Sequence, residues 1–542
     1  MFIEDIKNDF YNVLLGNRVL LLVHYDVDAV CTCKILQDLF KCDNISYTLV
    51  PVGGIAELKT AYEENNEEVK YVVLVNCGGT IDLVDILQPE EDVVFFVLDA
   101  HKPTDVCNVY SDGQVRLVYK DEEEDIPNFD DIFRDDEEEN EEDVEESGRE
   151  GLEALVERRR ERRAWEEKRN TLMFNYTQFS YYGKPSACVA LELWWRLSRG
   201  GAGAAWAAGV ALEAAGALHL RSAPRALLDA APLHALLAAR PADPHSPSVV
   251  LEQDMNLPLY RVWTLESALR HSPDVGPHLR LHTVAGASKL RQLLVDMGVP
   301  LQQARQAFRA MDAAVRAGAR DALAAAGSRL RLAGAAPRAA PLLTRPHAPP
   351  LAALDLVYCI LGLLEHDSIP RAEGFQHALA ALEPDSGDSE SRREGWQAAR
   401  RSLEAVVRLV NCTLSGRQLH LAGPFNYFIV QEGSPEARAV QGPLWLGVAA
   451  RWAAAAAAAG SRAGARPLVA SANTGDTSAA CLVLGVPPRS QHEPRNLFGA
   501  AFEQAATKSG VSISLDYLDS SVISLPTSQR AQFLDALTAL LA

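Results

Sequence analysis

Near the start of the sequence, three carboxylate side chains and one imidazole side chain come shortly after short apolar runs. Asp26 and Asp28 follow the run RVLLLVH, and Asp99 and His101 follow the run DVVFFVL. In an open parallel sheet, ligands bind beyond the carboxyl ends of the strands, so these four side chains could share one crevice. Carboxylates suit Mg²⁺ and Mn²⁺, and Mn²⁺ also accepts imidazole. Because two such ions held about 3.5–4 Å apart clamp a phosphodiester, the pattern predicts a two-metal phosphoesterase site.

The ligand set of this site is incomplete. Asn76, which follows the third apolar run, stands where a bridging carboxylate would be useful, and its amide is neutral. Ala100, in the same group of residues, offers no ligand. Taken singly, each polar residue has a simpler explanation, because residues at strand ends often cap helices, and Asp28 before Ala29 fits that role. Their joint placement favours an ancestral site that has lost part of its chemistry.

The elements that must position these residues alternate between strands and helices. Over the first 120 residues, continuous apolar runs typical of strands buried on both faces are separated by helical stretches. This alternation predicts a parallel, doubly wound sheet. Residues 201–400 are rich in Ala and Leu and helical in period, and strand signals return afterwards, which predicts a second, smaller α/β domain. The expected strands are residues 18–24, 46–52, 71–75 and 92–98 in the first domain, and 420–421, 426–430, 481–485 and 522–525 in the second.

The negative charge of the chain is concentrated in one tract. Of a net charge of −20, residues 121–146 contribute −16, from 17 acids and one base, which leaves −4 for the rest. Such a tract cannot bury enough apolar surface to fold alone, so we expect a disordered acidic loop over residues 121–147. Residues 149–170 hold eight bases and six acids and predict a solvated, charged helix. Contact with phosphates and nuclear import are the alternatives for its arginines.

Several protein classes are disfavoured by the same sequence. No CxxC pair occurs among the nine cysteines, which argues against a zinc ribbon. No apolar run reaches the roughly 18 residues of a membrane span. The start MFIEDIKNDF is acidic, unlike a secretory signal. We therefore expect an intracellular protein that makes no contact with a membrane.

Three motifs at the strand ends resemble the DHH phosphoesterase superfamily, the RecJ-type nucleases and their relatives. YDVDAVCTCKIL resembles the first motif of that family, VNCGG its Asp-x-Gly motif with Asn76 for the aspartate, and LDAHKP its Asp-His-His motif with Ala100 for the middle histidine. The resemblance implies an α/β protein with three parts. These are a parallel, doubly wound DHH-like domain over residues 1–225, a helical inserted region over residues 226–400 and a smaller α/β DHHA1-like domain over residues 401–542.

The chain as a whole resembles one eukaryotic branch of this superfamily, a catalytically degenerate subunit of the replicative DNA helicase. The stretches LVPVGG, DILQPEED, YRVWTLESAL and NLFGAAFEQAA carry the resemblance in the expected order. It implies a nuclear protein needed for initiation and elongation of DNA replication. The implied partners are the minichromosome-maintenance ring, the GINS complex, replication initiation factors and the leading-strand polymerase, with single-stranded DNA as a further contact.

Three hypotheses about function remain open at this point. In the first, Asp26, Asp28, Asn76, Asp99 and His101 mark a relict site that holds no metal or other cofactor, and the chain is a non-catalytic scaffold. In the second, the remaining ligands hold Mn²⁺ and the chain is an active single-strand exonuclease or phosphodiesterase. In the third, the chain is a structural subunit without DNA contact. The neutral residues in the ligand set favour the scaffold. Active members of the superfamily carry a Gly-Gly-Gly-His motif for single-strand contact, and its lack here argues against a DNA-gripping role for the C-terminal domain.

Overall fold

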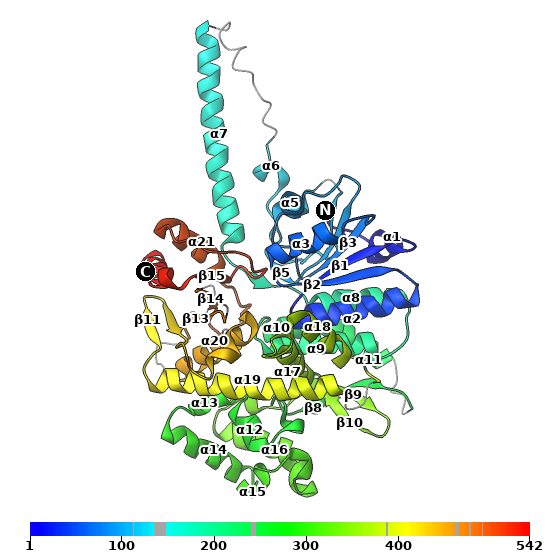
Figure 1. Ribbon diagram of the computed structural model, residues 1–542, viewed down its shortest axis with the longest axis vertical. Helices are drawn as coiled ribbons and strands as arrows, with labels where there is room; N and C mark the ends of the chain where they lie inside the picture. The colour runs from blue at the N-terminus through cyan, green and yellow to red at the C-terminus, as the bar shows by residue number, and fades with distance from the viewer. Residues whose placement is uncertain are drawn as a thin grey trace.

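Two five-stranded sheets, one from each end of the chain, organise the fold (Figure 1). In the part of the chain that is described, no helix is long and apolar enough to cross a membrane. The structure is a computed structural model that describes residues 1–111, 113–134, 148–239, 245–385, 389–460, 465–475, 479–489 and 492–542.

The N-terminal sheet is parallel throughout and has the strand order β2-β1-β3-β4-β6. Along the central strand β1, Leu21 and Val23 enter the hydrophobic core on one face, and Leu20 and Leu22 enter the core on the other. Because both faces are covered, the strand is apolar without a break, and the expected doubly wound sheet is confirmed. The strands are β1 (Val19–His24), β2 (Tyr47–Val52), β3 (Tyr71–Val75), β4 (Val94–Leu98) and β6 (Val115–Leu117).

Helices cover both faces of this sheet. The first core contains residues of α2 and α8, and the second contains residues of α3, α4 and α5. The helical stretches that the sequence predicted between the strands are therefore present. The bounds are η1 (Ile6–Tyr11), α1 (Asn12–Leu14), α2 (Val27–Cys42), α3 (Ile55–Asn65), α4 (Leu83–Leu87), α5 (Val106–Val109) and α8 (Ser186–Arg196).

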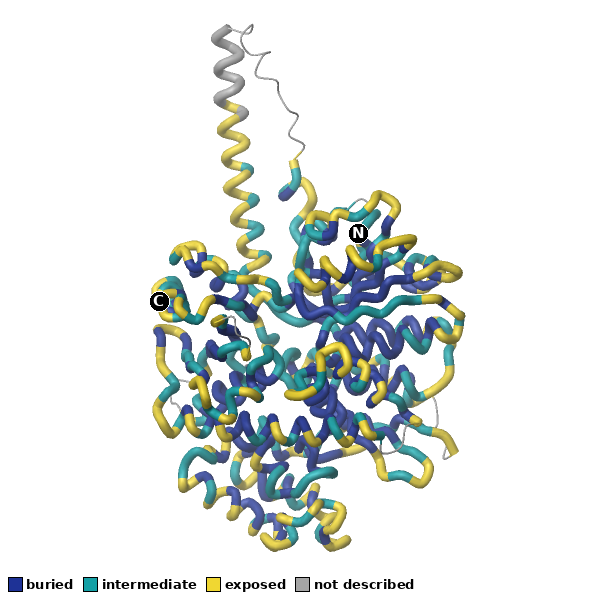
Figure 2. The backbone as a smooth tube through the Cα atoms, viewed as in Figure 1, coloured by how far each residue is buried: buried dark blue, intermediate teal, exposed yellow. Residues whose placement is uncertain are grey.

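Between β6 and α8 the chain makes a long excursion from the body. Its main element, α7 (Gly148–Thr177), projects away from the two sheets and is exposed over most of its described length (Figures 1 and 2). The short antiparallel pair of β5 (His101–Lys102) and β7 (Tyr181–Tyr182) joins the chain before the excursion to the chain after it. The charged helix expected from the sequence is thus longer than residues 149–170 and stands apart from the body.

The expectation of a disordered acidic loop is wrong for residues 121–134. The side chain of Glu124 is fully buried, where its carboxylate pairs with Lys102 Nζ at 3.0 Å and accepts a hydrogen bond from Tyr176 Oη at 2.8 Å. A buried ammonium group needs such a counter-charge, and this fixes the start of the tract. Further along, α6 (Phe129–Ile132) packs against α7. Residues 135–147 lie outside the described part of the chain.

The middle of the chain is mostly helical, but it also contains strands that the sequence did not predict. An antiparallel sheet of order β10-β9-β8 interrupts the expected helical region over residues 226–400. Two of its strands, β9 and β10, are rich in Ala and Pro and contain few of the β-branched and aromatic residues that signal a strand. The bounds of the three strands are β8 (Ser248–Asp254), β9 (Arg338–Arg345) and β10 (Ala348–Ala352).

Residues 255–335, here called the inserted unit, pack around a hydrophobic cluster of their own. In Figure 1 the unit lies below α19, at the opposite end of the molecule from α7. Its elements are η3 (Tyr260–Val262), α12 (Leu265–Arg270), α13 (Gly276–Leu279), α14 (Val284–Asp296), α15 (Leu301–Ala304), η4 (Phe308–Ala310), α16 (Ala313–Arg329) and η5 (Ala333–Ala335). The other helices in the middle of the chain are α9 (Gly203–Ala217), α10 (Ala223–Asp229), α11 (Ala231–Ala239), α17 (Ala353–Leu364), α18 (Arg371–Ala381) and α19 (Glu390–Ser415).

The C-terminal domain is built on a mixed sheet of order β11-β12-β13-β14-β15, which confirms the smaller α/β domain. All four expected strands are present, and β13 lies between two of them without having been predicted. The strands are β11 (His420–Ala422), β12 (Phe425–Ile429), β13 (Leu468–Asn473), β14 (Ala480–Val486) and β15 (Val522–Pro526). The helices are η6 (Ala437–Val440), α20 (Pro443–Gly460), α21 (Phe498–Ser509), η7 (Thr527–Gln529) and α22 (Arg530–Leu541).

The close crossing of α17 and α19 gives a test of the packing. A Cβ atom on Gly362 would lie 2.6 Å from the carbonyl oxygen of Gly395 and 2.7 Å from the backbone nitrogen of Ala399. We expect Gly362→Ala to lower the free energy of unfolding by roughly 1–3 kcal/mol, because the two helices must separate. Gly318→Ala in α16 is the matched control, since nothing lies within 4 Å of its Cβ position. It should instead add about 0.5–1 kcal/mol through helix propensity, and urea denaturation that gave both variants the same sign would contradict the packing.

Candidate functional site

The aspartates after β1 hold the starts of two helices. Asp26 is the N-cap of α2, and its Oδ1 accepts a hydrogen bond from the backbone N–H of Ala29 at 2.8 Å. The simpler explanation of Asp28 as the cap of the same helix is therefore wrong. Asp28 lies in the first turn of α2, and its carboxylate accepts the backbone N–H groups of Ser186 at 2.8 Å and Ala187 at 3.0 Å. It thus binds the N-terminus of α8, where an anion is favourable.

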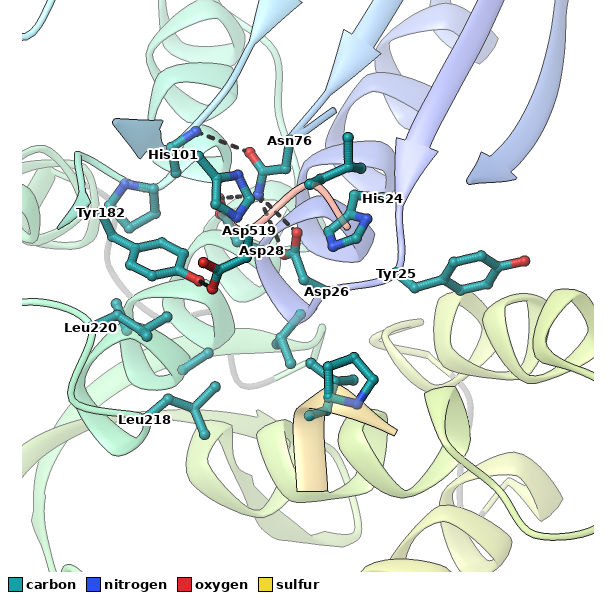
Figure 3. A pocket seen from close by; sticks show the side chains of 18 of the residues that line it. His24, Tyr25, Asp26, Asp28, Asn76, His101, Tyr182, Leu218, Leu220 and Asp519 are labelled. Carbon is teal, nitrogen blue, oxygen red and sulfur yellow. Dashed lines mark hydrogen bonds between the residues drawn. The ribbon is translucent and has the colours of Figure 1, made fainter. Parts of the chain in front are cut away.

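Asn76 lies between these two carboxylates, as Figure 3 shows. Its Nδ2 donates to Asp26 Oδ2 at 3.2 Å and to Asp28 Oδ2 at 3.0 Å. Its Oδ1 accepts hydrogen bonds from Ser186 Oγ at 2.6 Å and from the backbone N–H of Ala100 at 3.2 Å. Both ends of the amide are engaged, and its nitrogen can donate two hydrogen bonds while its oxygen accepts two, which an ionised carboxylate cannot do. An aspartate at this position would have no donor for its two neighbours.

Asp99 and His101 form a separate buried pair at the end of β4. Asp99 Oδ1 lies 2.7 Å from His101 Nδ1, and its Oδ2 accepts the backbone N–H of Gly79 at 2.8 Å. A Cβ atom on Gly79 would lie 2.8 Å from Asp99 Cβ, so glycine is needed for this approach. Burial lowers the pKa of His101, but the Asp99 carboxylate outweighs it and raises that pKa to about 9. The imidazolium in turn overcomes the effect of burial on Asp99 and lowers its pKa.

Burial has the opposite effect on the pKa values of the two aspartates that follow β1. It raises the pKa of Asp28 to about 6, and the Asp26 carboxylate adds to the effect. The pKa of Asp26 is raised as well, mainly by burial. Burial also lowers the pKa of the nearby His24 to about 4, so this imidazole is neutral. The site therefore contains two carboxylates that burial pushes towards the protonated form, with a neutral amide between them.

A pair of divalent cations does not fit these residues. The position between Asp26 and Asp28 is taken by the Asn76 amide nitrogen, and the Asp28 oxygens already accept backbone N–H groups. Both Asp99 oxygens likewise accept hydrogen bonds, from Gly79 and His101. Among the residues that the structure describes, no group of three or more His, Cys, Asp or Glu side chains is arranged to hold a metal ion. The cluster is suited to joining strand ends to helix starts.

The structure also brings in residues that the sequence did not single out. A cavity of about 130 Å³ lies between the strand ends and the C-terminal domain, and Tyr182, Arg451 and Asp519 are among the residues that line it. Figure 3 shows Tyr182 and Asp519 beside the strand-end residues. Tyr182 Oη donates to Asp519 Oδ2 at 2.9 Å. Ser186, 110 residues beyond Asn76, belongs to the polar cluster itself. Its position at the start of a helix after Pro185 was the one available signal, and that signal does not indicate a partner.

Substitution of Asn76 tests the role of its amide. We expect Asn76→Asp to lower the free energy of unfolding by roughly 2–5 kcal/mol in metal-free buffer, because a third carboxylate replaces the donor between two buried ones. Mn²⁺ should recover part of this loss by binding the folded state, without producing phosphodiester cleavage. Urea denaturation with and without Mn²⁺ measures both effects.

Asn108→Asp is the matched control for this substitution. Asn108 is equally buried, but its amide nitrogen donates to backbone oxygens, those of Gly78 at 3.0 Å and Ile81 at 2.6 Å. This variant should also be destabilised, and Mn²⁺ should not restore it. An Asn76→Asp protein as stable as the parent in metal-free buffer would contradict the assignment.

The pair of Asp99 and His101 predicts a pH dependence. Because the pKa of His101 is raised from its ordinary value of 6.5 to about 9, its contribution is complete below pH 6.5 and is lost as the pH rises through 9. That shift corresponds to roughly 3 kcal/mol. The unfolding free energy of the parent protein should therefore fall by about this amount more than that of His101→Gln over the interval. Parallel pH curves for the two proteins would rule the ion pair out.

Comparison with known proteins addresses the chain as a whole. The family model CDC45 matches residues 19–155 and 130–540. The human cell division control protein 45 homolog is 34% identical over 567 residues, which cover 100% of both chains. The crystal structure of CDC45 from Entamoeba histolytica covers 100% of both chains with a TM-score of 0.74 at 18% identity. A crystal structure of exonuclease RecJ bound to manganese covers 99% of this chain with a TM-score of 0.45 at 13% identity. The chain belongs to the CDC45 family.

Proposed function

We propose that this chain is a non-catalytic subunit of the eukaryotic replicative DNA helicase. In this role it acts in the nucleus, in initiation and elongation of DNA replication, and bridges the minichromosome-maintenance ring and the GINS complex. Initiation factors and the leading-strand polymerase are further partners, and single-stranded DNA is a further contact. Membership of the CDC45 family supports the setting, and the polar cluster supports the absence of catalysis.

The observation that carries the non-catalytic assignment is the hydrogen bonding of Asn76. Its amide nitrogen donates to both aspartates of β1, at the position where a phosphodiesterase needs a cation. A metal ion that entered would have to break these bonds and those from the N-terminus of α8. In this proposal Asp26, Asp28, Asn76, Asp99 and His101 are a relict site that now stabilises the fold.

The shape of the molecule supports a bridging role. The helix α7 and the inserted unit project from opposite ends of the body, so each is open to a different neighbour (Figure 1). On α7, Phe174 remains 47% exposed, and on the inserted unit Val284 remains 89% exposed. Exposed apolar side chains on two separate projections are what a subunit that joins two partners requires.

Two measurements on the full chain test this function. Affinity capture from a nuclear extract should recover the ring and GINS subunits in stoichiometric amounts. Incubation with labelled single-stranded DNA and Mn²⁺ should give no cleavage, because no pair of cations can assemble. Cleavage that disappears in Asp28→Ala would establish the exonuclease instead. Recovery of none of these partners would contradict the scaffold.

A further inference from the structure

A short segment of the C-terminal domain crosses to the N-terminal domain. Residues 515–519, here called the strap, lie between α21 and β15 in the sequence. Both ends of the strap are fastened to the C-terminal sheet. Ser514 pairs with Ser524 of β15, and the backbone N–H of Val522 donates to the carbonyl oxygen of Asp519 at 3.0 Å. The residues between these two points make their contacts with the other domain.

The first of these contacts is at the start of α3. The N-cap residue of α3 is Gly54, which has no side chain to accept the N–H groups of the helix. Asp516 of the strap takes that role, because its carbonyl oxygen accepts the N–H of Ile55 at 2.8 Å and its Oδ1 accepts the N–H of Ala56 at 2.6 Å. A carboxylate is favourable at a helix N-terminus. A Cβ atom on Gly54 would collide with the carbonyl oxygen of Asp516, so this glycine lets the strap approach.

The second contact is apolar. Leu518 is 3% exposed and belongs to the hydrophobic core on one face of the N-terminal sheet, with Leu22 of β1 and Leu58 of α3. Among the described residues, it is the one member of this core that comes from the C-terminal domain. Leu515, in the same strap, is 39% exposed. The strap therefore inserts one of its two leucines into the other domain, where removal of apolar surface from water holds it.

The third contact joins the strap to the chain that follows α7. Asp519 Oδ2 accepts a hydrogen bond from Tyr182 Oη at 2.9 Å, and both side chains are drawn in Figure 3. The other oxygen of this carboxylate accepts the hydroxyl of Ser521 at 2.7 Å, which fixes its orientation. The strap is thus attached to the N-terminal domain by a helix cap, a buried leucine and a hydrogen bond to a tyrosine.

The strap also forms part of the wall of the cavity at the strand ends. Tyr517, Leu518 and Asp519 line this cavity, which has a volume of about 130 Å³. The strand-end residues on the same cavity are buried, with Asn76 2% exposed and Ala100 5% exposed. Movement of the strap away from α3 would therefore uncover the residues of the polar cluster.

We propose that the strap is a lid. It closes the cavity over the strand ends while Asp516 and Leu518 are in place, and it opens the cavity when they are released. The closed lid is an autoinhibitory contact, because it keeps solutes from the cluster of Asp26, Asp28 and Asn76. The proposal goes beyond the proposed function, since it concerns access to the cluster and not the chemistry of the cluster itself.

The test measures access to the cavity with a thiol placed on its wall. Ala100→Cys in the full chain supplies the thiol, and mass spectrometry follows its alkylation by N-ethylmaleimide. The exposed Cys42 reports that the reagent is active, and the fully buried Cys77 reports global unfolding. We expect the thiol at position 100 to be protected in this background.

Release of the lid should remove this protection. Leu518→Ala should raise the alkylation rate at position 100 at least roughly tenfold, because the strap loses its contact in the core. Asp516→Ala should raise it roughly fivefold, because α3 loses its cap. The alkylation rate of Cys77 should stay unchanged in both variants.

Two variants serve as matched controls. Leu515→Ala makes the same substitution in the same strap at an exposed side chain. Asp82→Ala removes a cap within the N-terminal domain, where Asp82 Oδ1 accepts the N–H groups of Val84 and Asp85 at 3.1 Å each. Neither should change the alkylation rate at position 100. Backbone hydrogen exchange at residues 181–183 gives the same comparison without Ala100→Cys.

Three outcomes would overturn the lid. They are rapid alkylation of position 100 in the background protein, an unchanged rate in both lid variants, and an equal gain in rate at Cys77, which would make the opening global. None of these measurements involves the helicase subunits or DNA. Failure of the lid and failure of the proposed function are therefore distinguishable.

Discussion

The contact of one amide with two buried carboxylates governs the architecture around the strand ends. Asn76 comes from β3, and Asp26 and Asp28 come from the start of α2, so the amide joins adjacent parallel strands where their hydrogen-bonded ladder ends. Hydrogen bonds of Asp28 and Ser186 attach the N-terminus of α8 to the same cluster. This helix follows the long excursion of the chain that contains α7. Two carboxylates in this position without a donor between them would repel each other in a medium of low dielectric constant. The neutral amide relieves that repulsion without a metal.

The sequence predicted this region well because its signals are local. Strands β1, β3 and β4 are uninterrupted apolar runs, and the polar residues that follow them are ordered by the parallel sheet alone. Residues that reach the site from a distant part of the sequence could not be predicted in this way. Ser186 reaches Asn76 across 110 residues, and its hydroxyl is one of many in the chain. The sequence of strand β9, RAAPLLTR, contains Ala and Pro residues that are not typical of strands, and its pairing with β8 and β10 makes it a strand.

Charge is distributed unevenly over the long axis of the molecule. The described start of the acidic tract lies beside α7, and the inserted unit lies at the other end (Figure 1). Arg261, Arg309, Arg316 and Arg320 of that unit line one hollow. The net charge of the chain indicates neither surface, because the acids are clustered in sequence while these arginines are spread from Arg261 to Arg320. A molecule with opposite charges at its two ends orients in the field of a charged partner before contact, and salt weakens this effect.

The short pairing of β5 with β7 has a consequence for how the fold can vary. His101 pairs with Tyr182 and Lys102 with Tyr181, so the chain that leaves the body returns to it at the same place. Between these two strands the chain first returns to the sheet as β6. The acidic tract and α7, which come after β6, form a loop, and the free energy of closing such a loop rises only with the logarithm of its length. Residues can thus be gained or lost in the acidic tract or in α7 at little thermodynamic cost to the sheet. The acidic tract and α7 can therefore be shortened, or exchanged for another segment, while the pairing of β5 with β7 and the rest of the protein keep their structure.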